Sequence, residues 1–384
     1  MFLNSPIHGD QRVFKEARTL ADAGYDVSII CQQKSEIPFA AWKGINIISI
    51  PRQPSFLFPG RFTFDWIRTT ISLRPDIIHA HDLNTLGRAF ITAKLTGAYL
   101  VYDSHDWCTE TTATLRYPAY RRFYCRWKER LLARRAEKVI FPVPGLCRIA
   151  VEKLGIAEPI CICNFPRGEV IARNKLLRTE LDIPTEARIV LYEGILARDR
   201  GLEEIVLSVR LIPDDVVIVF LGDGYFKQHL RELVVSNRLE DQVKFMDTVS
   251  VEKFPLYCAG ADAGIVIYRV EGLTTVHGWP TKVFDYLRAG LPVLISAGPE
   301  IMRMIVSAQA GKEIVEQNPE GIAWAIRDIF RNEDEFQQLR RNAIKTWREK
   351  FNWESEAKKL LILYKDLCSP PGDPHLRTKI NPDN

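Results

Sequence analysis

Apolar runs of strand length alternate with amphipathic stretches along most of the chain. The runs are rich in Val, Ile and Leu, whereas the stretches between them repeat their apolar residues every three to four positions. Such alternation is typical of parallel α/β sheets. It predicts strands at 2–4, 25–31, 46–51, 76–80, 99–103, 138–142, 188–192, 216–221, 243–246, 263–267 and 292–296. It predicts helices at 11–23, 83–96, 117–136, 201–211, 280–289, 320–350 and 353–367, and a further helix that ends at 238.

A polar stretch without sustained periodicity separates two such series. The pattern predicts an α/β fold of two Rossmann-like domains facing across a cleft, with ligands bound beyond the carboxyl ends of the strands. We expect an N-terminal domain at 1–165, a linker at 166–186 and a C-terminal domain at 187–350. A helix at 351–368 is expected to cross back to the N-terminal domain, and a tail at 369–384 to be disordered.

Composition excludes several classes of protein. The chain has 384 residues, of which 46% are hydrophobic and 26% charged, with a formal net charge of +4; these values exclude a fibrous or disordered protein. No apolar run approaches the ~18 residues of a membrane-spanning helix, and the first residues do not resemble a secretory signal. The eight cysteines lack the spacing of a zinc site or a disulfide framework. We therefore expect a soluble, cytoplasmic protein with reduced thiols.

Loops at the ends of two strands in the first half carry candidate site residues. Gly9 allows the backbone to approach a ligand closely, and Asp10 either joins that site or only caps the helix that follows. His105 lies in a polar loop after the strand at 99–103. A histidine in this position is suited to donate a hydrogen bond or to move a proton.

A third strand end carries two histidines. His79 and His81 share one face of a strand, a placement that suits a metal ion. No third and fourth ligand is recognisable in the sequence. Capping of the next helix by Asp82 is the simpler interpretation, and we expect no metal site.

Two loops in the second half carry positive charge. Gly194 ends a strand, and Arg198 and Arg200 precede a helix. Guanidinium groups beside a helix N-terminus suit a diphosphate, although solvated surface arginines are the alternative.

Gly272 and Gly278 then bracket an irregular loop that leads into a helix beginning near Pro280. On one face of that helix, Lys282 suits a phosphate and Asp285 suits the two hydroxyls of a ribose. An ion pair between these two side chains is the alternative.

Together these stretches resemble the retaining, nucleotide-sugar-dependent glycosyltransferases of family four, within the glycosyl transferases group 1, which have the GT-B fold. The resemblance runs from the first residues to about Leu367 and rests on the order and spacing of several motifs. These are DQRV, EAR and LADAGYDV within 10–27, PDIIHAHD at 75–82, VYDSHD at 101–106, RGLE at 200–203, GDG at 222–224 and PTKVFDYLRAGLPV at 280–293.

The resemblance implies that the C-terminal half binds the donor and the N-terminal half the acceptor. His105 matches the family's histidine that contacts the donor sugar, Arg200 replaces a phosphate-binding lysine, and Asp285 replaces the glutamate that binds the ribose. Gly9 matches the glycine loop near the diphosphate. The expected catalytic residues are His105, Arg200 and Lys282. The expected donor-binding residues are Gly9, Gly194, Arg198, Arg200, Gly278, Thr281, Lys282 and Asp285. The acceptor-side candidates are Asp10 and Asp106.

The sequence departs from the family pattern at several positions. Ile195 stands where the family has an arginine, so Arg198 is the candidate substitute for that phosphate-binding cation. His277 stands where the family has the first glutamate of a pair. A subgroup with a Pro-Asn-Lys helix start also lacks that glutamate, and Thr281 takes the place of its asparagine. Asp285 is one methylene shorter than the usual glutamate.

The implied reaction is retaining transfer of a sugar from a UDP- or GDP-sugar to a glycan or polyprenyl-linked acceptor, in polysaccharide or surface-glycan biosynthesis. Preorganised cations stabilise the leaving diphosphate in such a reaction. The sequence has no strand-ending Asp-x-Asp to hold a metal, so we expect no metal and no cofactor. A sugar-nucleotide epimerase of similar fold and a catalytically silent nucleotide-binding relative are the alternatives.

Residues 116–138 form a basic, aromatic segment. They hold nine basic and two acidic side chains, so this segment is more positive than the whole chain. Five apolar side chains follow helical spacing: Tyr117, Tyr120, Tyr124, Trp127 and Leu131. Such a segment suits anionic lipids at the inner face of a membrane, and the alternative is a helix that packs its stripe on the sheet and solvates its charges. The two interpretations are compatible, since the stripe can be buried while the arginines contact lipid. We expect no nucleic-acid partner, because no stacking platform motif is present.

Overall fold

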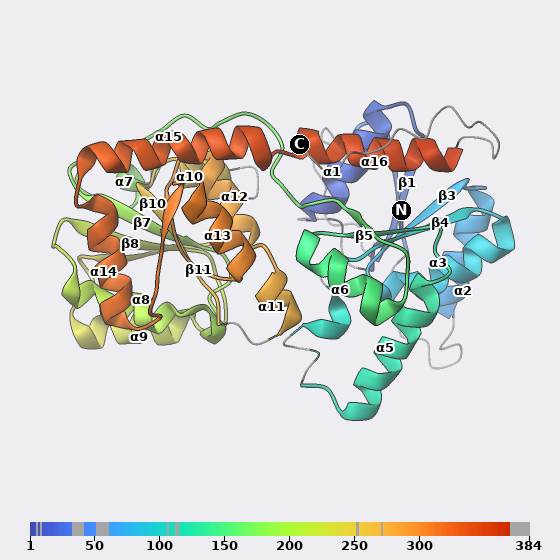
Figure 1. Ribbon diagram of the computed structural model, residues 1–384, viewed down its shortest axis with the longest axis horizontal. Coiled ribbons are helices and arrows are strands. Elements are labelled where there is room, and N and C mark those ends of the chain that lie inside the picture. Colours follow the sequence, from blue (N-terminus) through green and yellow to red (C-terminus); the bar gives the residue numbers. More distant parts are fainter. Residues whose placement is uncertain are drawn as a thin grey trace. The chain divides into compact units, whose positions relative to one another are not determined.

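The computed structural model describes residues 1–4, 7, 10–32, 42–50, 61–105, 107–111, 114, 116–250, 253–269 and 272–368. Strands and helices alternate along these residues, as Figure 1 shows. By their contacts they form two compact units. The first comprises residues 1–103, 135–140 and those from 356 onward, and the second comprises residues 104–134 and 141–355.

A six-stranded parallel sheet is the centre of the second unit. Its order is β12-β11-β10-β7-β8-β9. The strands are β7 (Arg188–Glu193), β8 (Val216–Leu221), β9 (Val243–Met246), β10 (Ala263–Ile267), β11 (Val293–Ser296) and β12 (Gly311–Glu313). β7 is the first of these along the chain, yet it pairs with both β8 and β10. The strand order therefore reverses between β7 and β10, and ligands bind at such switch points in open α/β sheets.

Helices cover both faces of this sheet. One face packs on α8 (Leu202–Ser208), α9 (Lys227–Asn237) and α14 (Pro319–Phe330). The other packs on α7 (Leu176–Glu180), α10 (Phe254–Cys258), α12 (Thr281–Arg288), α13 (Pro299–Ser307) and α15 (Glu333–Lys350). Because both faces are covered, the central strands are apolar throughout, and Val190 and Leu191 belong to opposite core layers.

A smaller parallel sheet organises the first unit. β3 (Ile77–His81) pairs with β4 (Tyr99–Asp103), β4 with β5 (Lys138–Phe141), and β1 (Val27–Cys31) with β2 (Ile45–Ser49). The helices of this part are α1 (Gln11–Asp22), α2 (Arg61–Ser72), α3 (Leu83–Thr96) and most of α16 (Trp353–Cys368). The second unit also contains α5 (Ala119–Ala133), α6 (Pro144–Leu154), β6 (Ile160–Cys161) and α11 (Leu273–His277).

Most predicted elements are present, and several have the predicted bounds. The strands at 99–103, 216–221, 243–246 and 263–267 and the helix at 83–96 are confirmed. The strand predicted at 2–4 is wrong: Phe2 forms only single bridges, to Ile30 and Ala80. The helix predicted at 320–350 is two helices, because the Asn332 side chain accepts a hydrogen bond from the Glu335 backbone nitrogen at 3.1 Å and so begins α15.

Some elements were not predicted from the sequence. These are α2, α6, α10, α11, α13, β6, β12 and the short α7 within the stretch expected to be a linker. The tail predicted at 369–384 lies outside the described residues.

Candidate functional site

The candidate site lies at the carboxyl ends of β7, β8 and β10. Glu193 ends β7 and is followed by Gly194; Gly222 follows β8 and Tyr268 follows β10. The N-terminal turn of α12 contributes Lys282. The strand order thus brings four segments that are distant in the sequence to one edge of the sheet.

Glycines let the backbone loops at this edge approach one another. Gly194 has φ +116° and Gly222 has φ +151°, conformations that side chains rarely adopt. A Cβ atom at Gly222 would lie 2.0 Å from the Gly194 carbonyl oxygen, and one at Gly194 would lie 3.2 Å from Nζ of Lys282. Gly194, which we predicted as a donor-binding residue, therefore leaves space directly beside a cation.

Lys282 is a buried cation on an aromatic ring. Its Nζ lies 3.9 Å from the Tyr192 ring centroid and 5.8 Å from that of Tyr268. Burial lowers the pKa of Lys282 to about 8, Glu193 opposes this shift, and the nearby charge of Arg200 adds to it. The two predicted phosphate-binding cations therefore lie close enough to repel each other, which an anionic ligand would relieve.

Arg200 lies over the second of these rings. Its Cζ is 4.0 Å from the Tyr268 ring centroid, and its Nη1 is buried without a hydrogen-bond partner among the described residues. Arg198 is exposed instead, with its guanidinium 5.5 Å from the Phe226 ring centroid. Arg198 thus fits the alternative of a solvated surface arginine, whereas Arg200 does not.

Glu193 was not predicted as a site residue. Burial raises its pKa well above the usual value, the charge of Asp285 raises it further, and Lys282 opposes these effects. The Cys258 thiol donates a weak hydrogen bond to Glu193 Oε2 over 3.8 Å. The position of Glu193 at the end of a predicted strand was the available signal, but a glutamate there is equally typical of a solvated strand end.

The approach to α12 differs from the predicted loop. Gly272 and Gly278 flank a short helix, α11 (Leu273–His277), so the prediction of an irregular loop is wrong. The Thr275 hydroxyl accepts a hydrogen bond from the Gly272 nitrogen at 2.9 Å and so closes the first turn. A Cβ at Gly278 would lie 2.0 Å from the Thr274 carbonyl oxygen, so this turn requires glycine. Thr281 is exposed at the start of α12.

Two of the N-terminal candidates lie among the described residues: Asp10 precedes α1, and His105 follows β4. Asp10 caps α1: its side chain accepts a hydrogen bond from the Val13 nitrogen at 3.1 Å. Asp82 has φ +64° and its side chain does not cap α3, so the predicted cap is wrong. His105 is half-buried after β4. Gly9 and Asp106 lie outside the described residues, and the roles of these candidates remain predictions.

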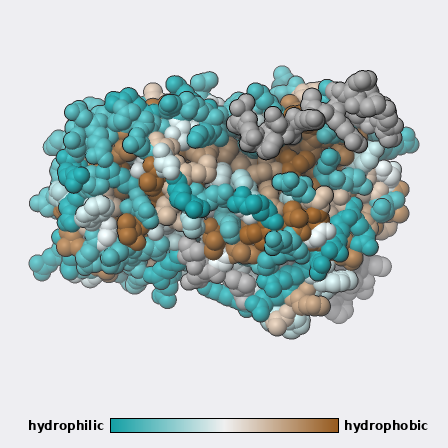
Figure 2. Space-filling view, viewed as in Figure 1, coloured by the Kyte–Doolittle hydropathy of each residue, from teal (hydrophilic) through white to brown (hydrophobic). Residues whose placement is uncertain are grey.

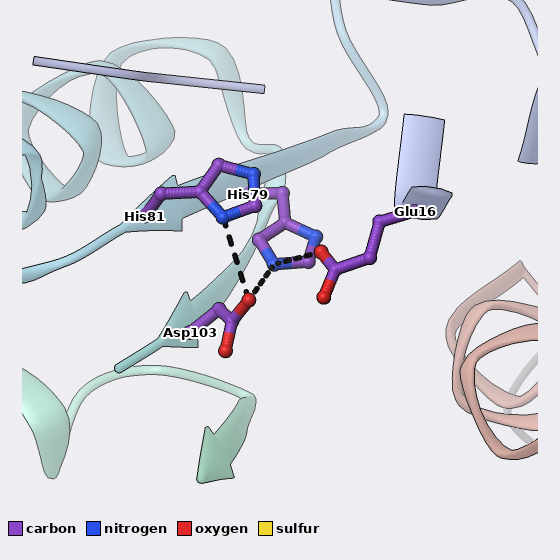
Figure 3. Close-up of side chains that lie close together, drawn as sticks. All are labelled: Glu16, His79, His81 and Asp103. Carbon is purple, nitrogen blue, oxygen red and sulfur yellow. Dashed lines mark ion pairs between the residues drawn. The ribbon is translucent and has the colours of Figure 1, made fainter. Parts of the chain in front are cut away.

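A second cluster of titratable side chains lies within the first unit (Figure 3). Glu16 of α1 and Asp103 of β4 meet His79 and His81 of β3, with one ligand atom of each within 4.8 Å of the others. No third and fourth ligand was recognisable in the sequence, but the fold supplies two carboxylates beside the histidines. These carboxylates lie 22 residues or more from the histidines along the chain, so no local motif joins them.

Arg12 already supplies a cation to this cluster. It donates two hydrogen bonds to Asp103, at 2.9 and 2.7 Å, and its Nε lies 3.1 Å from Glu16. His79 Nδ1 lies 2.8 Å from the Tyr364 hydroxyl of α16. Burial lowers the pKa of His79, and Asp103 partly offsets this effect. The buried guanidinium thus pairs with both carboxylates of the cluster, and the expectation that no metal binds here remains a prediction.

Two family models match the chain. The model described as "Glycosyl transferase 4-like domain" matches residues 10–164, and the one described as "Glycosyl transferases group 1" matches residues 174–346. The chain belongs to the glycosyl transferases group 1, with the GT-B fold.

Curated relatives are distant and are matched in part. An uncharacterised glycosyltransferase of Methanocaldococcus jannaschii is 22% identical over 57% of this chain and 60% of its own length. The putative colanic acid biosynthesis glycosyl transferase WcaI of Escherichia coli is 26% identical over 38% of this chain and 37% of its own. The α-monoglucosyldiacylglycerol synthase of Streptococcus pneumoniae is 25% identical over 43% of this chain and 37% of its own. The matches thus span less than two thirds of these relatives.

Solved structures share the fold along nearly the whole chain. Sucrose-phosphate synthase of Thermosynechococcus elongatus has a TM-score of 0.76 at 17% identity, covering 96% of this chain and 99% of that one. HepE of Anabaena, in complex with UDP and glucose, has a TM-score of 0.77 at 15% identity, covering 95% and 100%.

Proposed function

We propose that this protein is a retaining glycosyltransferase that moves a sugar from a UDP- or GDP-sugar to a glycan or polyprenyl-linked acceptor. The observation that carries the proposal is the pair of cations, Lys282 and Arg200, that converge at the β7–β10 switch point. Nη1 of Arg200 is buried without a hydrogen-bond partner among the described residues, and positive charge beside glycines that admit close approach suits a diphosphate. The UDP bound in the HepE structures supports the choice of a nucleotide ligand.

The proposed reaction depends mainly on charge. The bond between the sugar C1 and the diphosphate oxygen breaks, and a bond from C1 to the acceptor oxygen forms on the same face. The acceptor proton passes to the departing diphosphate, so no protein base is required. Lys282 and Arg200 stabilise the charge of this leaving group, Asp285 binds the ribose hydroxyls, and His105 contacts the donor sugar. We propose that the reaction needs neither a metal nor a cofactor.

The setting we propose is surface-glycan or polysaccharide assembly in the cytoplasm, at the inner face of the membrane. The relatives support this choice, because one is named for colanic acid biosynthesis and another for a glucosylated diacylglycerol.

A thermal-shift screen against UDP, GDP, ADP and their sugar conjugates tests the donor site, because a ligand raises the melting temperature according to its affinity and concentration. We expect a shift with one base that is lost in Arg200→Ala and Asp285→Ala. Arg269→Ala is the matched control, since Arg269 is an exposed arginine that pairs with Glu204. No shift with any nucleotide would overturn the proposal.

Product analysis separates the alternatives. A transferase releases nucleoside diphosphate slowly even to water, and a chelator leaves that release unchanged. An epimerase converts one sugar into another without an acceptor. A nucleotide-dependent shift without turnover would instead favour a catalytically silent relative, to which the exposed Ile195 and the His277 substitution point.

A further inference from the structure

The outer face of α5 exposes four aromatic rings. Tyr120 is 77% exposed, Phe123 73%, Tyr124 56% and Trp127 52%. Together these four residues are called the aromatic face. The interpretation that the predicted stripe packs on the sheet is therefore wrong for Tyr120, Tyr124 and Trp127, and Phe123, outside that stripe, joins them.

The opposite face of α5 anchors the helix. Leu132 and Ala133 are buried, as is Glu129, whose Oε2 accepts hydrogen bonds from Trp107 Nε1 at 3.2 Å and from Thr109 Oγ1 at 2.6 Å. At 3.6 residues per turn these positions lie across the helix axis from the aromatic face. The helix is thus held by its inner side, and the aromatic rings do not contribute to the core.

Basic side chains flank the aromatic face on both sides. Helical periodicity places Arg121 and Lys128 along one edge of it and Arg130 along the other. Arg121 lies 4.0 Å from the Tyr117 ring centroid. Glu129, the only acidic residue of α5, is buried on the inner side, so the outer surface of the helix carries positive charge alone. Figure 2 shows apolar and hydrophilic side chains together where Figure 1 labels α5.

We propose that this face of α5 binds the surface of an anionic bilayer, with the aromatic face in the headgroup region and the flanking cations on lipid phosphates. Tyr and Trp rings favour the membrane interface because one end is apolar and the other polar, and basic residues beside them are attracted by anionic lipids. None of the helices in the described parts of the chain is long and apolar enough to span a membrane. The face therefore provides peripheral attachment, which does not depend on the proposed reaction.

Flotation of the full chain with vesicles tests this proposal. We expect binding to vesicles of phosphatidylcholine with phosphatidylglycerol, weak binding to phosphatidylcholine alone, and loss of binding as salt rises. Replacing three cations (Arg121→Gln, Lys128→Gln, Arg130→Gln) is expected to weaken binding on the order of 100-fold, from roughly fivefold per charge. The matched control removes three exposed cations from α15: Lys345→Gln, Arg348→Gln and Lys350→Gln.

Two single variants isolate the aromatic contribution. Trp127→Ser is expected to weaken vesicle binding several-fold. Trp324→Ser on α14 is the control, because Trp324 is 53% exposed and Trp127 52%, and it is expected to leave binding unchanged. Each variant is checked for its far-ultraviolet circular dichroism and for the nucleotide-dependent melting shift, so loss of fold is separated from loss of membrane binding.

Three results would overturn the proposal. These are equal binding to neutral and anionic vesicles, equal loss in the α15 control, and flotation unaffected by Trp127→Ser. Tighter binding to a mixed-sequence RNA than to anionic vesicles would also overturn it, and would assign the surface to nucleic acid.

Discussion

The ammonium group of Lys282 lies 3.9 Å from the centroid of the Tyr192 ring, beside Gly194 in the loop that follows β7. Burial at this position lowers the pKa of Lys282 to about 8, more than two units below an ordinary lysine. The cation that we propose to bind the diphosphate is thus expected to titrate near pH 8.

Nucleotide affinity should therefore depend on pH. Lys282 is charged below pH 8 and neutral above it, so the affinity for UDP or GDP, whichever binds, is expected to be constant near pH 7 and to fall up to about tenfold per unit above pH 8. Isothermal titration calorimetry between about pH 7 and pH 9.5 measures this. Lys282→Met should bind weakly at every pH; an unchanged break at pH 8 in that variant would assign the titration to another group.

Glu193 should control the pH above which the nucleotide affinity falls, here called the break in affinity. Its negative charge raises the pKa of Lys282, so Glu193→Gln is expected to move the break in nucleotide affinity to lower pH. Glu180→Gln is the control, because Glu180 accepts hydrogen bonds from Tyr257 and lies outside the site. A break at the same pH in Glu193→Gln would contradict the prediction, since it would mean that Glu193 is already neutral.

The close approach of two loops should not tolerate a side chain. In Gly222→Ala the new Cβ would lie 2.0 Å from the Gly194 carbonyl oxygen, so the loop beside Lys282 must move. We expect a loss of several kcal/mol in the free energy of unfolding, beyond the ~1 kcal/mol that positive φ alone costs, together with weaker nucleotide binding. Gly97→Ala is the control, because Gly97 has φ +77° with no atom within 4 Å of the added carbon. Equal effects in urea unfolding of the two variants would contradict the steric argument.

The buried histidine network should make the fold sensitive to acid. Burial lowers the pKa of His79 in the folded state, so below its ordinary pKa of about 6.5 the unfolded chain binds a proton that the folded chain does not. Stability is therefore lost as pH falls from about 6.5 toward the folded-state pKa, by up to ~1.4 kcal/mol per unit. No contribution is expected above pH 6.5, where both states are neutral.

Urea unfolding across this pH range checks that expectation. His79→Gln should reduce the slope of the free energy of unfolding against pH in acid. His229→Gln should leave this slope unchanged, because His229 is half-exposed and pairs with Glu203. A slope unchanged by His79→Gln would assign the acid sensitivity to the carboxylates instead.

Much of the fold could be predicted from local patterns. Strands such as β8 (Val216–Leu221) are continuous apolar runs because both faces of the sheet are covered, and α3 (Leu83–Thr96) ends at Gly97 in a left-handed conformation. Elements such as α11 and α13 were missed, since short helices carry too few turns for a periodicity to be recognised. Lys282 and Arg200 could be singled out as candidate phosphate ligands because each lies in a motif at a strand or helix end, and that role remains a prediction.

The sequence by itself determined the alternation of strands and helices, the loops that carry the site residues and the family. These features depend on side-chain period and turn chemistry within short segments. Only the tertiary structure decided that Glu193 lies beside Lys282, that Glu16 and Asp103 meet the two histidines, and that the rings of α5 are exposed. A helical period is the same whether its stripe is buried or solvated, and contacts between distant segments depend on strand order, which no local pattern encodes.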